Sequence, residues 1–270
     1  MKLKTVKNEI KTRGVEVEFL GCGGAFDVNQ GNSSAVLTSP KREKLLIDCG
    51  SLVFKEILNR GLAESINSVI ITHTHDDHIG SLSAFIYLKW FVLKTPLEIY
   101  CSEAVSKKLN IYLLDVSGHE KEQFNIHPIK IGFEFSPIEG VKAGFFDVTK
   151  YHVSTLPNAG VVLEISDFRI VYSSDTNEFA MNIIEKSNKP LYDSLSANKN
   201  NVLIFHDVSK YYLPGNSVHI FYEELAEQAK EYKNLFVYHH SKEDADFMKA
   251  AGFPFTSINR IKGKKLTINN

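Results

Sequence analysis

The stretch that decides the fold reads Ile71-Thr72-His73-Thr74-His75-Asp76-Asp77-His78-Ile79-Gly80. It holds three histidines and two aspartates within six residues. The preceding run, residues 68–72, is β-branched and apolar and predicts a buried strand, while residues 80–90 predict a helix. The cluster therefore lies where a strand ends and a helix begins, which is a common place for a site in an α/β protein.

The spacing of these side chains indicates metal chemistry. His73 and His75 are two residues apart, so they would diverge on a helix but can converge from a loop. Asp77 and His78 are adjacent, so they diverge unless two different centres use them. Neutral imidazole together with carboxylate suits Zn²⁺, Mn²⁺ or Fe. Two metal ions sharing one loop explain the pattern better than one ion or a solvated polar loop.

Length and composition narrow the class of protein. The chain has 270 residues and 43% hydrophobic content, which suits one α/β domain with a large core. The formal net charge is −1, from 31 Lys and Arg against 32 Asp and Glu. This balance gives no electrostatic reason to expect tight, sequence-independent binding to long nucleic acid.

The cysteines and the apolar segments indicate the compartment. Cys22, Cys49 and Cys101 are sparse and widely spaced, which argues against a disulfide framework and for a reducing compartment. Residues 1–13 lack the apolar segment of a secretory signal, and the most apolar window, residues 84–93, is too short to span a bilayer. We therefore expect a soluble, cytoplasmic protein.

Periodicity predicts alternating strands and helices in two similar halves. Strands are predicted at residues 15–20, 35–38, 45–50, 97–100, 131–135, 145–151, 160–165, 168–172, 202–205, 235–238 and 265–268. Further helices are predicted at residues 52–62, 102–114, 219–232 and 244–251. We expect residues 15–49 to form an antiparallel meander and residues 1–14 to be peripheral. The pattern favours a sandwich of sheets with helices outside.

Strands that end in histidine or aspartate recur along the chain. Besides the 73–78 cluster, this happens at His152, Asp175, His206, and the pair His239 and His240. His119 and His127 lie in a polar context that adjoins no buried strand, so we predict both to be surface histidines.

These motifs together resemble the metallo-β-lactamase superfamily over nearly the whole chain, from Phe19-Leu20-Gly21 to the last strand. The resemblance implies a single-domain, four-layer αβ/βα sandwich with a two-metal site along one edge of the sheets. It implies that the first metal is held by His73, His75 and His152. It implies that Asp77, His78 and a late histidine hold the second, with Asp175 bridging the two.

The late histidine is ambiguous from the sequence. Tyr238-His239-His240-Ser241 resembles the Thr-His-x-Ser ending of the RNase Z-like branch, which selects His239. Adjacent residues at a strand end point to opposite sides, so only one of the two reaches the metals. We expect the other to orient a neighbour or to face solvent.

Three further features resemble the RNase Z-like phosphodiesterase branch. The run 172–176 is similar to its Ser-Gly-Asp-Thr motif, and 205–207 to its His-Glu motif. His219 is predicted to open a helix, at a position that resembles the catalytic histidine of the branch. The Gly/Pro-rich arm of enzymes that grip precursor tRNA is missing from residues 116–150, which favours a smaller phosphodiester. Some compact members of this branch, in bacteria and their phages, cleave cyclic nucleotide signals.

The resemblance and the site chemistry together imply a mechanism. Two metal ions lower the pKa of a shared water and supply hydroxide near neutral pH. Asp77 is expected both to bind metal and to orient this nucleophile, and His219 to protonate the leaving oxygen. His206 and Asp207 are expected to orient a ligand or His219, and Asp76 is left without a metal role. Residues 211–212, both tyrosine, could stack on a nucleobase or simply pack.

The sequence therefore predicts a hydrolase that cleaves a phosphodiester in a cyclic or other small nucleotide. It would use two divalent ions, with zinc favoured and Mn²⁺ or Fe possible, and would act as a homodimer away from membranes. Three alternatives stay open: an endonuclease that processes RNA 3′ ends, a lactonase, thioesterase or β-lactamase, and a binding module without activity. A deep closed pocket over the metals would favour a small substrate, and an open basic groove would favour RNA.

Overall fold

Two β-sheets pack face to face in the computed structural model, which describes residues 12–210, 218–253, 256–258 and 266–269. Within these residues each sheet has seven strands. The first runs in the order β14 (Leu266–Asn269), β1 (Thr12–Gly21), β2 (Ser34–Thr38), β3 (Lys44–Ile47), β4 (Ile66–Ile70), β5 (Leu97–Ser102) and β6 (Phe124–Ile129). The second runs in the order β13 (Thr256–Ser257), β12 (Leu235–Tyr238), β11 (Val202–Asp207), β10 (Phe168–Tyr172), β9 (Ala159–Ile165), β8 (Val141–Asp147) and β7 (Glu134–Ile138).

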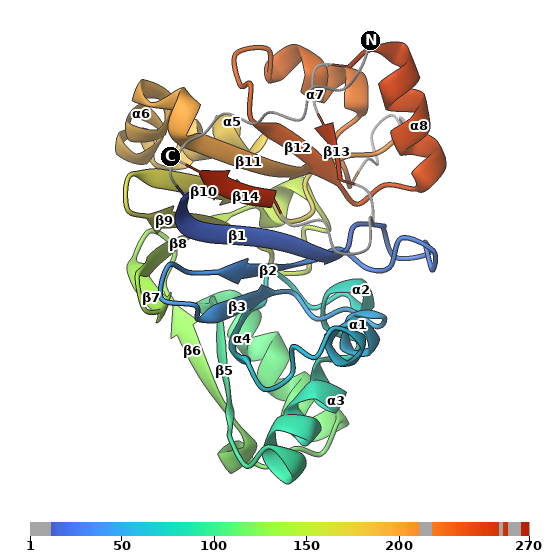
Figure 1. Cartoon of the computed structure of the whole chain (residues 1–270), viewed down its shortest axis with the longest axis vertical. Helices are drawn as coiled ribbons and strands as arrows, with labels where there is room; N and C mark the ends of the chain where they lie inside the picture. The colour runs from blue at the N-terminus through green and yellow to red at the C-terminus, as the bar shows by residue number, and fades with distance from the viewer. Residues whose placement is uncertain (1–11, 211–217, 254–255, 259–265, 270) are drawn as a thin grey trace.

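Helices cover the outer face of each sheet, as Figure 1 shows. The first sheet carries α1 (Val53–Asn59), α2 (Asp76–Ile79), α3 (Leu82–Tyr87) and α4 (Glu103–Asn110). The second carries α5 (Ala180–Ser187), α6 (Lys189–Ala197), α7 (Tyr222–Gln228) and α8 (Lys242–Ala251). The result is the four-layer αβ/βα sandwich that the sequence predicted.

The alternation of side chains along the strands produces these layers. On β2, Ala35 and Leu37 face the second sheet, whereas Val36 between them packs under the helices of the first. All three are buried, so the strand is apolar on both faces. The inner layer is completed from the other side by residues such as Phe145 and Leu163.

Strand direction brings the site residues to one edge. Strands β1–β2–β3 are antiparallel, as predicted, but β3–β4–β5–β6 and β10–β11–β12–β13 run parallel. The carboxyl ends of parallel strands meet at a common edge, where α/β proteins place their ligands. The metal loop therefore starts at the carboxyl end of β4, and residues 173–175 and 239–240 follow β10 and β12.

Several element boundaries differ from the sequence prediction. The helix expected at residues 80–90 already starts with the turn α2, and a π-helical turn continues α3 over Leu88–Val92. Strand β6 was not predicted. The helix expected from His219 begins at Tyr222, because Ile220 is held in a loop where its N–H donates to Thr176 O (2.9 Å). Helix α8 begins at Lys242, where Ser241 and Asp244 form a capping box.

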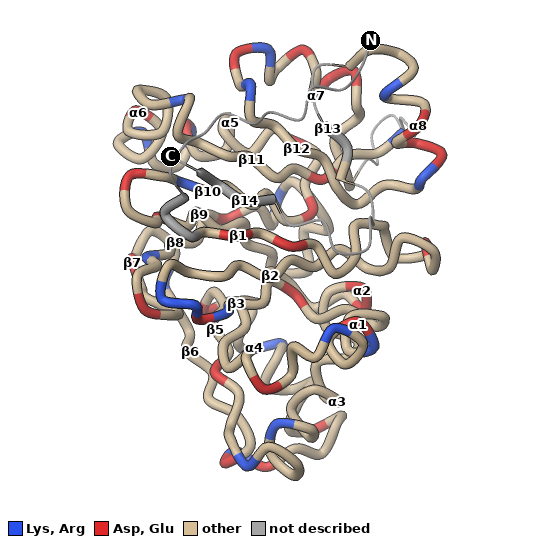
Figure 2. The backbone as a smooth tube through the Cα atoms, viewed as in Figure 1, with Lys and Arg blue, Asp and Glu red and all other residues tan. Residues whose placement is uncertain are grey.

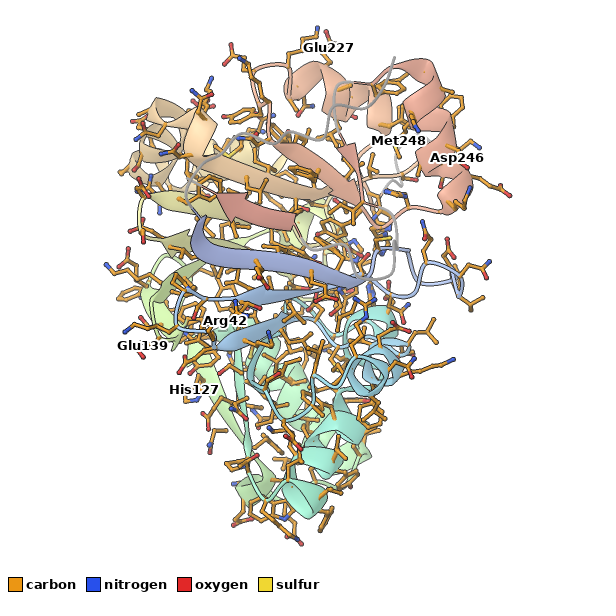
Figure 3. The ribbon with its side chains drawn as sticks, viewed as in Figure 1. Arg42, His127, Glu139, Glu227, Asp246 and Met248 are labelled. Atoms are coloured by element: carbon orange, nitrogen blue, oxygen red, sulfur yellow. The ribbon has the colours of Figure 1, made fainter. Side chains whose placement is uncertain are left out.

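Charged residues of both signs are interspersed over the described backbone, as Figure 2 shows. The turns that carry Arg42 and Glu139 lie at the end of the sandwich away from α2, and His127 lies near the outer edge of the first sheet (Figure 3). Among the described residues, no helix is long and apolar enough to cross a membrane.

Candidate metal centre and active site

A first cluster of three histidines forms at the edge of the sheets. The cluster consists of His73, His75 and His152. His75 Nδ1 lies 3.1 Å from His73 Nε2 and 3.2 Å from His152 Nε2. His73 and His75 converge because they lie in a loop between β4 and α2, where His75 has an extended backbone, as expected from their spacing. His152 follows the short turn Thr149–Tyr151 after β8 and donates its Nδ1–H to Val218 O (3.1 Å), which leaves Nε2 facing the cluster.

A second cluster lies beside the first and contains two carboxylates. It consists of Asp77, His78, Asp175 and His239. His239 Nε2 lies 3.2 Å from Asp77 Oδ2 and 3.4 Å from Asp175 Oδ2. His78 Nε2 lies 3.3 Å from the same Asp175 oxygen. This oxygen is also 3.9 Å from His73 Nε2, so Asp175 lies between the two clusters.

The donor atoms of both clusters fit divalent metal ions. Three imidazole nitrogens converge in the first cluster without an acid, and they cannot all satisfy one another with hydrogen bonds. In the second, His78 Nε2 and Asp175 Oδ1 are buried without a hydrogen-bond partner among the described residues. Buried polar atoms that lack partners need an explanation, and an ion is one of the common ones. Imidazole with carboxylate is the donor set of zinc and related metals.

Electrostatics keeps the first cluster in the metal-binding form. Burial lowers the pKa of His73 well below the ordinary histidine value, and His78 lowers it further. Burial likewise lowers the pKa of His75 and of His152. Neutral imidazole is the form that binds metal, and a lowered pKa favours this neutral form in all three side chains.

The carboxylates of the second cluster are held ionised. Burial alone would raise the pKa of Asp77 and Asp175, but the neighbouring histidines lower both. His78 makes the largest lowering contribution at Asp77, and His239 at Asp175. Both acids therefore present charged oxygens to the space between the clusters.

Asp48 was not predicted as a site residue, but it holds the loop that carries the histidines, residues 71–78, through contacts with Thr72 and His78. It is fully buried after β3 and accepts hydrogen bonds from Thr72 N (2.9 Å) and Thr72 Oγ1. Its Oδ2 lies 2.9 Å from His78 Nδ1, which directs the opposite ring nitrogen into the second cluster. The signal was present in the sequence, because Asp48 ends a strand like the residues that were singled out.

Replacement of Asp48 by asparagine is expected to weaken metal binding by about 10- to 100-fold, because the new amide would present an NH₂ or a weaker acceptor to His78. The dissociation constant of Zn²⁺ in Asp48→Asn can be measured by competition with a chromogenic chelator. Asp76→Asn is the matched control, since Asp76 is exposed in the same loop. Equal affinities in Asp48→Asn and wild type would remove this role from Asp48.

Three residues at strand ends adopt a left-handed backbone around the site. They are Asp48 (φ 59°), Ser174 (φ 59°) and His239 (φ 63°). This conformation costs non-glycine residues about 1–3 kcal/mol each and clusters at functional sites. It turns the chain sharply at the end of β3, β10 and β12, so that the site side chains leave the sheet edge toward one another. Ser174 occupies the position at which the similar Ser-Gly-Asp-Thr motif of the RNase Z-like branch has glycine.

Asn158 supports this strained turn and was not anticipated. Its Nδ2 donates to Asp175 O (2.8 Å), and its Oδ1 accepts from Ser174 Oγ (2.7 Å). Asn158 is buried, so these bonds are shielded from water. A lone asparagine before a strand gives no sequence signal for such a role.

His219 lies beside both clusters and is held by Asp207. Its Nδ1 is 2.7 Å from Asp207 Oδ2, and its ring centre is 4.5 Å from that of His239 and 5.7 Å from that of His152. Asp207 is fully buried and is fixed further by Thr176 N. This contact between Asp207 Oδ2 and His219 Nδ1 agrees with the expectation that Asp207 orients His219.

Other predicted histidines have structural partners. His206 donates Nδ1–H to Asp207 O (2.8 Å) and accepts Ala180 N–H at Nε2 (3.0 Å), so it holds the start of α5. Its Nδ1 also lies 3.3 Å from Asp207 Oδ1, on the carboxylate that contacts His219. His240 points away from the clusters and is buried against Val237 O and Ser241 O. His240 was expected either to orient a neighbour or to face solvent. The expectation that it faces solvent is wrong.

His119 corrects another expectation. It is 5% exposed and lies 2.8 Å from Ser83 Oγ and 2.6 Å from Gln123 Oε1, so it is not a surface histidine. His127 is part-exposed, as expected, and pairs with Glu98. Residues 211–212, offered as a stacking pair, lie outside the described residues.

An open pocket of about 870 Å³ adjoins the clusters. His219 and His239 lie on one wall, and residues 24–29, in the loop between β1 and β2, form another. This loop comes close because Cys22 O accepts hydrogen bonds from the N–H groups of His239 (2.7 Å) and His240. A Cβ on Gly24 would lie only 3.1 Å from His239 Cε1, so the backbone passes next to the site.

Comparison of structures shows the fold. The structure of the metallo-β-lactamase fold protein YhfI from Bacillus subtilis superposes with a TM-score of 0.71 at 20% identity, covering 93% of this chain and 98% of YhfI. Human tRNase Z, short form, gives a TM-score of 0.67 at 19% identity, covering 94% of this chain and 100% of the human chain. The metallo-β-lactamase fold predicted from the sequence is confirmed.

Comparison of sequences shows the family. The family model described as Anti-Pycsar protein Apyc1 matches residues 15–257. The Apyc1 protein of Bacillus phage vB_BveM-Goe7 is 42% identical over 175 residues, which span 60% of this chain and 67% of the relative. That of Bacillus phage 010DV004 is 25% identical over 251 residues, spanning 88% and 93%. The chain is a metal-dependent hydrolase and belongs to the Anti-Pycsar protein Apyc1 family.

Proposed function

We propose that this hydrolase opens cyclic nucleotides by adding water across one P–O ester bond at a two-metal centre. The observation that carries the proposal is the position of Asp175 between the two clusters, with the His219–Asp207 pair beside them. Asp175 Oδ2 lies within 3.9 Å of nitrogens from both sides, His73 Nε2 and His78 Nε2. A site of this form suits a phosphoryl group, because charge develops on both the entering and the leaving oxygen.

Seven side chains would hold the metal ions. The first ion would be bound by His73, His75 and His152, and the second by Asp77, His78 and His239, with Asp175 shared. Zinc is the metal we favour, and Mn²⁺ or Fe would suit the same donors. When bound, two such ions activate water near neutral pH and neutralise charge on the phosphoryl group.

The protein's own residues position the water and manage the protons. The ionised Asp77 carboxylate accepts a hydrogen bond from the attacking water and so orients it. One P–O bond forms to this oxygen, one P–O bond to the ribose breaks, and the released oxygen needs a proton. His219 is the donor, because it lies beside both clusters and Asp207 fixes its ring through Nδ1.

The surroundings of the site favour a small substrate. The pocket of about 870 Å³ is of the size that holds a drug-sized ligand. It is open, so the deep closed pocket expected for a small substrate is not present there, and the basic lining expected for RNA is the feature that decides. The charged residues that line the pocket are two lysines and three acids, namely Lys210, Lys242, Asp27, Glu243 and Asp244, so its wall is not a basic surface. Tight binding of long RNA depends on many phosphate contacts, which such a surface does not offer.

We also propose that the protein acts in the cytoplasm as a homodimer. The three cysteines are buried and form no disulfide bond, which supports a reducing compartment. The dimer rests on the general frequency of twofold oligomers.

Assay of metal-loaded protein against a panel of substrates tests the function. We expect cyclic purine and pyrimidine nucleotides to be converted to nucleoside monophosphates, seen by chromatography and ³¹P NMR. Structured precursor RNA, a lactone and a thioester serve as the competing substrates. Cleavage of the RNA alone would establish the endonuclease alternative, and turnover of the lactone or thioester alone would refute phosphodiester chemistry.

A further inference from the structure

The loop between β1 and β2 presents a phenylalanine to solvent beside the active site. Phe26 is 98% exposed, which is the largest value among the exposed large apolar side chains of the described residues, and Val28 is 70% exposed. In Figure 1 this loop projects at the right of the sandwich, between α8 and α2. A side chain of this size normally finds cover within the chain, because burying it is favourable.

The loop that carries Phe26 is held in place by hydrogen bonds. Asp27 Oδ1 accepts from the N–H groups of Asn29 and Gln30, both at 2.9 Å. Gly31 N donates to Asp27 O (3.0 Å), and Gly23 N to Gly31 O (2.8 Å). The exposure of Phe26 is therefore a property of an ordered turn and does not come from a loose tail.

The same loop forms a wall of the pocket over the candidate metal centre. Gly24, Phe26 and Val28 line it together with His219 and His239. Gly24 lies directly beside the second cluster, since a Cβ there would be 3.1 Å from the His239 ring. Two residues of chain span at most about 7 Å, so Phe26 stands within one nucleoside's length of the second cluster.

We infer that Phe26 is the stacking surface for the base of the nucleotide whose phosphate lies at the metal centre. This inference rests on the function proposed above. An aromatic face binds any base, because every base has a π-face, and it needs no hydrogen bonds to base edges. Val28 would widen the apolar wall that the sugar and base approach. Phe26 thus contributes to substrate binding and not to the chemical step.

Kinetics of Phe26→Ala tests the inference with two substrates. One is a cyclic nucleotide, and the other is the ribose 3′,5′-cyclic phosphate that lacks a base. We expect KM for the nucleotide to rise about 10- to 100-fold while kcat stays within about three-fold, since stacking acts on binding. The base-less compound should react equally well with both proteins. The variant Phe26→Tyr keeps an aromatic ring and should therefore have the KM of the wild-type protein.

The matched control is Phe133→Ala, because Phe133 is 59% exposed on a different part of the surface and lines another pocket. It should leave both substrates unaffected. An unchanged KM in Phe26→Ala, or an equal rise for both substrates, would overturn the stacking role and leave the proposed function standing. A wild-type protein that turns over neither substrate would overturn both. Size-exclusion chromatography of the variants completes the test, because a KM effect that appears only together with loss of a dimer would assign Phe26 to an interface instead.

Discussion

His73→Ala is expected to lower kcat/KM for a cyclic nucleotide by roughly 10⁴-fold or more, because the groups of a catalytic site act as a unit. His73 supplies a nitrogen to the first cluster and lies 3.9 Å from Asp175, which touches the second. Its loss would therefore disturb both metal positions. The measurement is steady-state kinetics together with the metal content of the same sample by mass spectrometry.

The control for this change is His127→Ala. His127 is a part-exposed histidine that pairs with Glu98 and lies outside both clusters. It should keep wild-type activity and metal content. An active His73→Ala protein that holds no metal would contradict every metal-dependent mechanism for this site.

His219→Ala is expected to reduce kcat for a cyclic nucleotide by about 10²- to 10⁴-fold with the metal content unchanged. The reason is that the ribose oxygen is a poor leaving group and needs the proton that His219 supplies. Bis(p-nitrophenyl) phosphate releases p-nitrophenolate, which leaves without a proton. The loss should therefore be much smaller with this substrate.

Comparison of the two substrates separates proton transfer from other roles of His219. Asp207→Asn should show the same dependence on leaving group in weaker form, because Asp207 Oδ2 lies 2.7 Å from His219 Nδ1. Equal losses with both substrates, or a loss of metal from His219→Ala, would refute the role of His219 as an acid.

Much of the fold followed from the pattern of the strands. The runs 160–165 and 168–172 are rich in β-branched and other apolar residues, flank a two-residue turn and form β9 and β10. The comparisons confirm the metallo-β-lactamase fold, the resemblance to ribonuclease Z proteins and a metal-dependent hydrolase. These predictions succeeded because a His-x-His-x-Asp-His loop after a buried strand has few other uses.

Strand β6 was missed for a physical reason. Its sequence mixes apolar residues with Asn125, His127 and Pro128, which is unlike a buried strand. It lies at the edge of its sheet, where one face is solvated and a proline costs no ladder hydrogen bond. His119 was misjudged similarly, since the polar residues around it gave no sign of the Ser83 and Gln123 partners that bury it.

The supporting residues of the site were harder to predict than the donors. Asp48 and Asn158 act through backbone turns at Thr72 and Ser174, and such tertiary contacts leave no spacing in the sequence. The choice of His239 over His240 came from the resemblance to the Thr-His-x-Ser ending. In the structure His239 lies beside Asp77, while His240 turns away to Val237 O. The assignment of individual metal ligands stays a prediction.

Titration of metal into chelator-stripped protein tests the central claim most directly. Hydrolysis of a cyclic nucleotide and bound metal per chain are measured in the same samples as Zn²⁺ is added back. For a two-metal centre we predict no activity in the stripped protein and a plateau at two equivalents per chain. Full activity without metal, or a plateau at one equivalent, would contradict it.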